Sequence, residues 1–292
     1  MKAFLVFVII LSASSLFALT VMAPDNPSSL PLLIAADHIP ELEVKLFSNH
    51  TQAHSLFLSG KVPLLLTGYA VGESFAQRDV PIKIAASWVS GLNYLVSADT
   101  SVSSFTELEG EKIYFPFKGS PIEKMSLWLA EQEGINVEKE LEIGYLPFIS
   151  MQEMMRQGSV KHAVMPVSSA LQIVDNEKYF FSFNLDKKWQ EITDSDFYPQ
   201  LCLFYDPRQK DGIPLELIIA ELANALELIN KNPQMVLNRY SSKLSYSPII
   251  INRTLQYLQF DIVSGKELQD KMEIYFEKSG ISKPPRSFYS TD

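Results

Sequence analysis

The chain has 292 residues, of which 47% are hydrophobic and 20% are charged, and its formal net charge is −9. This length suits two domains, and the apolar fraction is high enough for each to form a core, so a disordered chain is excluded. No run of Lys and Arg interrupts the acidic composition, which argues against nucleic acid as a partner.

The first 18 residues have the pattern of an export signal. Lys2 precedes an apolar run, and small residues then lead to Ala18. We predict that residues 1–18 are a signal peptide and that the mature chain is a soluble periplasmic protein. Because Leu16 stands where a small side chain is usual, an uncleaved membrane anchor is the alternative. Cys202 is the only cysteine, so we expect no internal disulfide.

The first half of the chain alternates apolar runs with helical patterns. The runs are apolar throughout rather than at every second residue, which is typical of parallel strands covered on both faces. We expect strands at LTVMAP, ELEVKLF, PLLLT and IKIAASW, and helices at 28–37, 51–59 and 69–77. A further strand, NYLVSA, leads into the polar stretch DTSVSS, where we expect the chain to cross into a second domain. Strands that alternate with helices predict an α/β fold.

The second half begins with a strand, KIYFPF, and a helix that has three start signals. Ser120 is placed to cap this helix, with Pro121 in its first position and Glu123 in its third. A second capping pair, Ser150 with Glu153, predicts the start of the next helix. The strand HAVM, a helix at 167–174 and the strand YFFSF complete this half.

Beyond residue 200 the run LCLFYD is expected to carry the chain back, and helices then predominate. They are predicted at 214–230, 233–242 and 267–278, with an edge strand at QFDIVS. A helical tail without a sheet of its own must cover one lobe, and we assign it to the first. The predicted lobe 1 comprises residues 19–97 plus 205–292, and the predicted lobe 2 comprises residues 98–204.

The two halves repeat one pattern. The strand ELEVKLF of the first half returns as ELEIGYL in the second. Upstream of these strands, Pro24 and Ser28 match Pro116 and Ser120 at one common spacing. We infer that a βαβαβ unit was duplicated.

A duplicated unit predicts a ligand site between the two copies. Ligands of open parallel sheets lie beyond the carboxyl ends of the strands, and two such edges face to face enclose a groove. The turns PDNPSS and PFKGSP each offer backbone N–H groups and a hydroxyl at a helix N-terminus, which suits an anionic group. The candidate ligand-binding residues are Asn26, Ser28, Ser29, Thr67, Gly68, Tyr69, Trp88, Asn93, Lys118, Gly119, Ser120, Met165 and Ser168.

Several of these candidates have a structural alternative. Ser28 and Ser120 can simply cap their own helices, and Lys118 can be a solvated surface residue. Trp88 offers either a stacking face or a core side chain, and Asn93 offers an amide beside the crossing between lobes.

A family resemblance covers essentially the whole chain after residue 18. The segments ELEGEKIYFPFKGSP, EQEGINVEKELEIGYLPF and QGSVKHAVMP resemble the solute-binding proteins of ABC importers for nitrate, sulfonates, taurine and thiamine pyrimidine precursors. The resemblance implies the two-lobed type II periplasmic binding protein fold, with a mostly parallel sheet in each lobe and two crossover segments. It also implies capture of a small solute by closure of the lobes, delivery to a permease with its ATPase, and a monomer.

The chain departs from this family at two motifs. Pro63 and Lys161 stand where the family usually has Asp after a Gly-x-Val, and Met165, Pro166 and Val167 stand where it often has Glu-Pro. The fold tolerates these changes, but no named member's ligand carries over. A small organic anion and a heterocycle, such as a pyrimidine or a flavin, both remain open.

An enzyme is the first alternative function, because some relatives of this fold make a pyrimidine precursor. His50 and His54 have the spacing of one helix face, but no third metal ligand stands near them in the sequence. Asp25 and Glu73 are possible paired carboxylates whose separation the sequence leaves open. The chain has no G-x-S-x-G, cysteine cluster or phosphate loop, so we expect no catalysis, metal or cofactor. A solute sensor or adaptor with the same fold is the second alternative.

Overall fold

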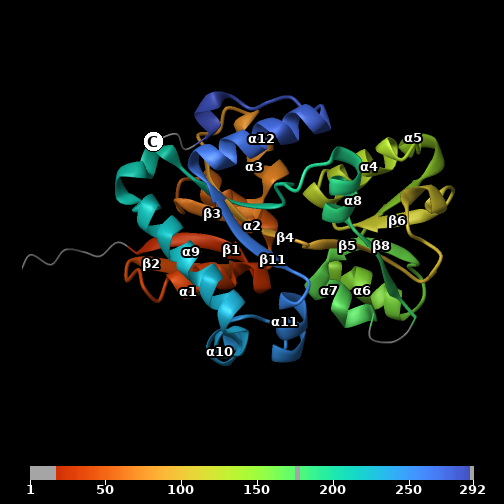
Figure 1. Cartoon of the computed structure of the whole chain (residues 1–292), viewed down its shortest axis with the longest axis horizontal. Coiled ribbons are helices and arrows are strands. Elements are labelled where there is room, and N and C mark those ends of the chain that lie inside the picture. Colours follow the sequence, from red (N-terminus) through yellow and green to blue (C-terminus); the bar gives the residue numbers. More distant parts are fainter. Residues whose placement is uncertain (1–17, 175–177, 290–292) are drawn as a thin grey trace, which may run out of the picture.

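The computed structural model describes residues 18–174 and 178–289 and contains two β-sheets flanked by helices (Figure 1). The predicted signal peptide lies outside these residues, apart from Ala18. Within the described ranges, no helix is both long enough and apolar enough to cross a bilayer. The predicted α/β class is confirmed.

The first sheet has six strands. They are β1 (Leu19–Pro24), β2 (Leu42–Phe47), β3 (Leu64–Gly68), β4 (Lys83–Ser90), β10 (Leu201–Tyr205) and β11 (Gln259–Ser264). Their order across the sheet is β11-β4-β10-β3-β1-β2. Strand β1 runs parallel to β2 and β3, whereas β10 runs antiparallel to both β3 and β4.

The second sheet repeats this arrangement with five strands. They are β5 (Asn93–Ser97), β6 (Lys112–Phe115), β7 (Glu142–Tyr145), β8 (His162–Pro166) and β9 (Phe180–Asn184). Their order is β7-β6-β8-β5-β9, with β6 parallel to β7 and β8 and with β5 antiparallel to β8 and β9. Strands β5 and β10 therefore hold equivalent places in the two sheets, which agrees with the predicted duplication.

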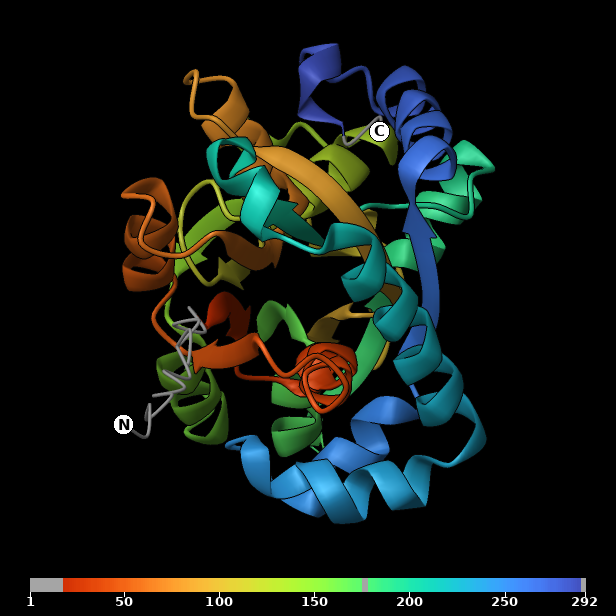
Figure 2. The ribbon, with the colours of Figure 1, turned by 90° about the vertical axis from the view of Figure 1, so that its left-hand side faces the viewer.

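Helices cover both faces of each sheet. The first sheet carries α1 (Leu30–Ala35), α2 (His50–Leu58), α3 (Tyr69–Ala76), α9 (Leu215–Lys231), α10 (Pro233–Tyr240), α11 (Pro248–Leu255) and α12 (Gly265–Ser279). The second carries α4 (Pro121–Gln132), α5 (Val137–Glu140), α6 (Phe148–Arg156), α7 (Val167–Val174) and α8 (Leu185–Thr193). Each sheet with its helices is called a lobe below, lobe 1 for the first and lobe 2 for the second; Figure 2 views the molecule from the side of lobe 1, with α9 beside the edge strand β11.

The chain crosses between lobes earlier than predicted at both places. Strand β5 pairs with β8 and β9, so the first crossing is at Gly91 and Leu92 and not near residue 98. Strand β10 pairs with β3 and β4, so the second crossing lies between Thr193 and Leu201 and not near residue 204. The predicted boundaries at 97/98 and 204/205 were therefore misplaced, because an apolar run indicates a buried strand without indicating the sheet that it joins.

The start of one helix differs from the sequence prediction, and two further helices were not predicted. Helix α6 begins at Phe148 after Pro147, so Ser150 lies within the first turn instead of capping it. Helices α8 and α11 were not predicted, although each has a capping side chain. Asn184 accepts a hydrogen bond from the Lys187 N–H, and Ser247 accepts one from the Ile250 N–H.

A continuous apolar core joins the two lobes. One cluster of buried residues includes Leu65 and Phe204 of the first sheet together with Leu95 and Leu129 of lobe 2. Helix α3 passes so close to β10 that a Cβ atom at Gly72 would lie 2.2 Å from Cζ of Phe204, which explains the glycine at this position. The lobes are in direct contact, and this arrangement is called the closed conformation below.

Candidate solute site between the two lobes

The turn after β1 is held together by its own polar side chains. Asn26 Oδ1 accepts a hydrogen bond from the Ser28 N–H at 2.9 Å and another from the Ser28 hydroxyl, while the Ser29 hydroxyl donates to the Pro24 carbonyl at 2.6 Å. Both serines are buried. Trp88 is 1% exposed, and its Nε1–H donates to the Ser28 carbonyl at 3.0 Å. In this conformation Trp88 is a core side chain beneath the turn, and the predicted stacking face is not available.

The N-terminus of α4 already carries a carboxylate of the chain itself. Ser120 caps the helix as predicted, because its hydroxyl accepts a hydrogen bond from the Glu123 N–H at 3.1 Å. The Glu123 carboxylate, which is 5% exposed, in turn accepts hydrogen bonds from the Gly119 N–H and, at 2.5 Å, from the Tyr145 hydroxyl. The bond to Glu123 raises the pKa of Tyr145 to about 12. The predicted anion site at Gly119 and Ser120 is therefore occupied by Glu123, and Lys118 lies exposed beside it.

The turn after β3 contacts lobe 2 directly. A Cβ atom at Gly68 would lie 2.6 Å from Cγ of Pro121, the first residue of α4. The next residue, Tyr69, donates its backbone N–H to the Gln200 carbonyl at 3.1 Å, and its side chain is buried. Gly68 and Tyr69 therefore lie where lobe 1, lobe 2 and the second crossing meet.

Two imidazoles lie beside this turn on α2. His54 Nε2 is 3.1 Å from the Thr67 hydroxyl, and burial lowers the pKa of His54 to about 4, with a further contribution from His50. Burial also lowers the pKa of His50, whose ring lies 6.3 Å from the ring of Phe117 in lobe 2. Both imidazoles are neutral at pH 7. Within the described chain, no group of three or more His, Cys, Asp or Glu side chains is arranged to hold a metal ion.

Asn93 lies in the hinge between the lobes. Its Nδ2 donates to Gln200 Oε1 at 3.1 Å, which joins the start of β5 to the second crossing. The first crossing is bonded as well, because the Gly91 N–H donates to Asp186 Oδ2 at 3.0 Å. Gly91 has φ +76°, and a Cβ atom there would lie 2.5 Å from the Tyr257 carbonyl oxygen, so both conformation and space require glycine. Burial raises the pKa of Asp186 to about 7, although the Gly91 N–H favours its charged form.

The remaining candidates lie at the start of α7. Met165 belongs to the apolar core of lobe 2, and Ser168 is buried. The neighbouring Ser169 hydroxyl lies 3.5 Å from the Tyr246 hydroxyl of lobe 1. The structure therefore brings the candidate turns of both lobes to one interface, but in the closed conformation most of their polar groups bond to the protein.

A small, partly open pocket lies between α3, α4 and α12. Its volume is about 30 Å³, and Tyr69, Glu73, Trp128, Tyr198 and Tyr275 are among its walls. Of these walls the sequence pattern indicates only Tyr69 and Tyr198 as aromatic groups near the site, because the walls come from three helices and the second crossing. The possible pairing of Glu73 with Asp25 does not form, because Asp25 accepts hydrogen bonds from the backbone N–H and the hydroxyl of Ser245.

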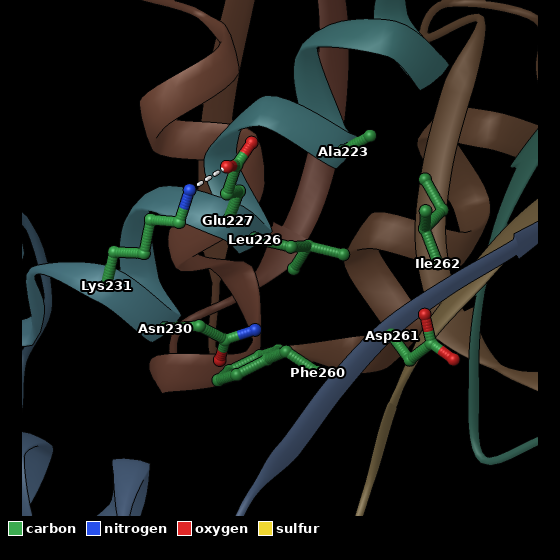
Figure 3. A pocket seen from close by; sticks show the side chains of 8 residues that line it. All are labelled: Ala223, Leu226, Glu227, Asn230, Lys231, Phe260, Asp261 and Ile262. Atoms are coloured by element: carbon green, nitrogen blue, oxygen red, sulfur yellow. Dashed lines mark hydrogen bonds and ion pairs between the residues drawn. The ribbon is translucent and has the colours of Figure 1, made fainter.

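A larger hollow of about 360 Å³ lies on the outside of lobe 1, between α9 and the edge strand β11 (Figure 3). Leu226 and Phe260 line it, and the ion pair of Glu227 with Lys231 lies at its side. None of the candidate turns reaches this hollow, so it is separate from the site between the lobes.

Comparison with solved structures identifies the fold. An ABC transporter protein from Parabacteroides distasonis is 13% identical with a TM-score of 0.72, and the match covers 94% of this chain and 99% of that one. The periplasmic aliphatic sulphonate binding protein SsuA from Escherichia coli is 14% identical with a TM-score of 0.72, and the match covers 92% and 89%. The Candida albicans CA3427 gene product, described as having the generic periplasmic binding protein fold, is 14% identical with a TM-score of 0.66 over 93% of each chain.

No protein-family model and no curated protein sequence matches the chain. The similarity to solved structures extends over nearly the whole length of both partners, so the chain has the periplasmic binding protein fold. The predicted fold is confirmed. At these identities the likeness concerns the fold and not the solute.

Proposed function

We propose that the chain is the extracytoplasmic solute-binding component of an ABC importer. In this role it is a monomer in a periplasm-like compartment, captures a small organic solute between its lobes, and delivers it to a permease and its ATPase. The observation that most supports this proposal is the contact of Gly68 with Pro121. It joins the turns at the carboxyl ends of two equivalent sheets, which is where open α/β sheets bind ligands.

The hinge supports capture by closure of the lobes. Asp186 bonds to the first crossing at Gly91, and Asn93 bonds to the second crossing at Gln200. Rotation at two short linkers is the usual way in which two lobes close around a ligand. A solute that contacts both lobes binds the closed state better than the open state, and it therefore shifts the population toward closure.

The charges at the interface support a solute without negative charge. Glu123 is buried at the N-terminus of α4 and Glu73 is buried beside α4, whereas Lys118 and Lys124 are exposed. Exposed lysines are screened by water, and a buried carboxylate repels an anion more strongly. Of the two solute classes that the sequence left open, a heterocycle with neutral or cationic nitrogen fits this interface better than a sulfonate or nitrate.

The direct test is identification of the solute that accompanies the protein. We expect native mass spectrometry of gently purified protein to detect one bound small molecule, and its release on unfolding allows its identification. Adding that molecule back should raise the melting temperature by mass action. Protein that carries no solute and responds to no organic anion, pyrimidine, flavin or amine in a thermal-shift screen would contradict the proposal.

A second measurement separates uptake from sensing. We expect the solute-loaded protein to stimulate the ATPase activity of the permease complex encoded with it, reconstituted in vesicles, and the solute-free protein to stimulate it less. Solute binding without any effect on such a complex would contradict the importer role and favour a sensor or adaptor with this fold.

A further inference from the structure

The pocket between α3, α4 and α12 contains polar groups that the protein does not satisfy. Glu73 is 4% exposed and Tyr69 is 2% exposed. Within the described residues, neither Glu73 Oε1 nor the Tyr69 hydroxyl has a hydrogen-bond partner. A buried polar group without a hydrogen-bond partner destabilises the folded chain, and a charged one does so more strongly. Such a cost at a pocket wall indicates a ligand that supplies the missing partner.

The walls around these groups are aromatic. The pocket is lined by Trp128 of lobe 2, Tyr198 of the second crossing and Tyr275 of lobe 1. Behind them lies Trp189, whose ring centroid is 5.3 Å from that of Tyr275. The faces of Trp and Tyr rings attract cations. A carboxylate within aromatic walls is a combination that binds an ammonium group.

The size of the pocket limits the group that enters it. A volume of about 30 Å³ holds one or two waters, and a primary ammonium group is of similar size. The pocket also includes Lys124, Ser279 and Ile281 on its rim. Lys124 is exposed to solvent. Burial raises the pKa of Glu73, and the positive charge of Lys124 opposes this shift.

We propose that this pocket binds the primary ammonium group of a small organic amine, with Glu73 and Tyr69 as its hydrogen-bond partners and the rings of Trp128, Tyr198 and Tyr275 as its walls. The inference rests on the proposed function, since it names a primary ammonium group as the part of the captured solute that enters this pocket. Glu73 and Tyr69 come from lobe 1 and Trp128 from lobe 2, so the pocket is complete only when the lobes are closed. Binding of the ammonium group therefore stabilises closure.

The test uses Trp128 and Trp189 as fluorescent reporters in the full mature chain. The probe is n-propylammonium chloride, compared with n-propanol and with sodium chloride at the same ionic strength. Because a ligand with so few non-hydrogen atoms can bind only weakly, the titration extends into the millimolar range. We expect saturable binding of propylammonium and none of propanol, which lacks the charge.

Two variants test the assigned partners. Glu73→Gln keeps the shape but removes the charge, and we expect it to weaken propylammonium binding at least about 10-fold without lowering the melting temperature. Tyr69→Phe removes only the hydroxyl and should weaken propylammonium binding several-fold. This second variant still tests the assignment if Glu73→Gln does not fold. The matched control is Glu131→Gln on the exposed surface of α4, which should bind like the wild type.

Three results would overturn the inference: no saturable response to propylammonium, an equal response to propanol, or unchanged affinity in both Glu73→Gln and Tyr69→Phe. Its failure differs from failure of the proposed function. A co-purified solute whose affinity is the same in the wild type and in Glu73→Gln would refute the amine pocket while leaving solute capture intact.

Discussion

Gly68 and Pro121 bring the two lobes into van der Waals contact: a Cβ atom at Gly68 would lie 2.6 Å from Cγ of Pro121 and 3.2 Å from its Cβ. The backbone of Gly68 has φ −61°, which every residue adopts. Glycine is therefore required here for the contact between lobes and not for the conformation of the turn.

We predict that Gly68→Ala shifts the molecule toward an open state. The added methyl group overlaps Pro121 only when the lobes are closed, so the radius of gyration in solution scattering should increase and solute affinity should fall about 10-fold or more. Gly212→Ala is the control, because nothing lies within 4 Å of the corresponding Cβ position. A Gly68→Ala protein with the scattering curve of the wild type would show that the closed contact is not populated in solution.

Two tryptophan substitutions should separate closure from folding. The Trp128 Nε1–H of lobe 2 donates to the Ser279 carbonyl of lobe 1 at 3.0 Å, whereas the bond from Trp88 to Ser28 lies within lobe 1. Trp128→Phe should weaken solute affinity by about 0.5–1.5 kcal/mol, and Trp88→Phe should lower the free energy of unfolding by at least as much. Calorimetric titration and urea denaturation measure the two quantities. The same pattern of losses in both variants would contradict the assignment of separate roles.

Asp186 should make the stability fall as the pH rises. In the folded chain its carboxyl keeps a proton up to about pH 7, whereas in the unfolded chain it loses the proton near pH 4. Its contribution to stability is therefore present below about pH 4 and is lost between about pH 4 and pH 7. Asp186→Asn cannot titrate, so its free energy of unfolding relative to the wild type should rise across this window by up to about 4 kcal/mol.

Urea denaturation at a series of pH values measures this effect, with Asp196→Asn as the exposed control. The difference between Asp186→Asn and the wild type should be small at pH 4 and largest above pH 7. A difference that does not change with pH would mean that Asp186 is charged in the folded protein at neutral pH.

His54 should have the opposite pH dependence. Burial holds its pKa at about 4, below the value near 6.5 of an unfolded histidine. The unfolded chain therefore takes up a proton first as the pH falls, and stability is lost between about pH 6.5 and pH 4. In His54→Gln, which retains a polar group near Thr67, this loss should be smaller. Chemical shifts of the His54 ring measure its pKa directly, and a midpoint near 6.5 would refute the prediction.

The succession of strands and helices along each half was largely predictable, because runs such as Leu19–Pro24 and Lys112–Phe115 are apolar, short and followed by helix signals. The sheet that a strand joins was not. Strands β5 and β10 have the same apolar pattern as the strands that precede them in the chain. Each nevertheless pairs in the sheet of the other lobe, after the chain has crossed between the lobes. Pairing depends on contacts between distant segments, which a local pattern does not contain.

The site was predictable at the level of turns but not of atoms. Ser120, Pro121 and Glu123 were recognised as a helix start, and the cap forms as predicted. The second role of Glu123 depends on Tyr145, which a separate strand supplies from the neighbouring position in the sheet. Trp88 likewise became a core residue because the Ser28 carbonyl lies above it. Partners from other segments decide whether a polar turn is free to bind a solute.

Ser279 is the last residue of α12, and its carbonyl accepts a hydrogen bond from the Trp128 indole N–H of the opposite lobe. Each separation of the lobes breaks this bond and exposes the indole N–H to water. The indole N–H of Trp128 is consequently an intrinsic reporter of opening that needs no attached label. The hydrogen-exchange rate of this proton gives the fraction of time that the two lobes are separated.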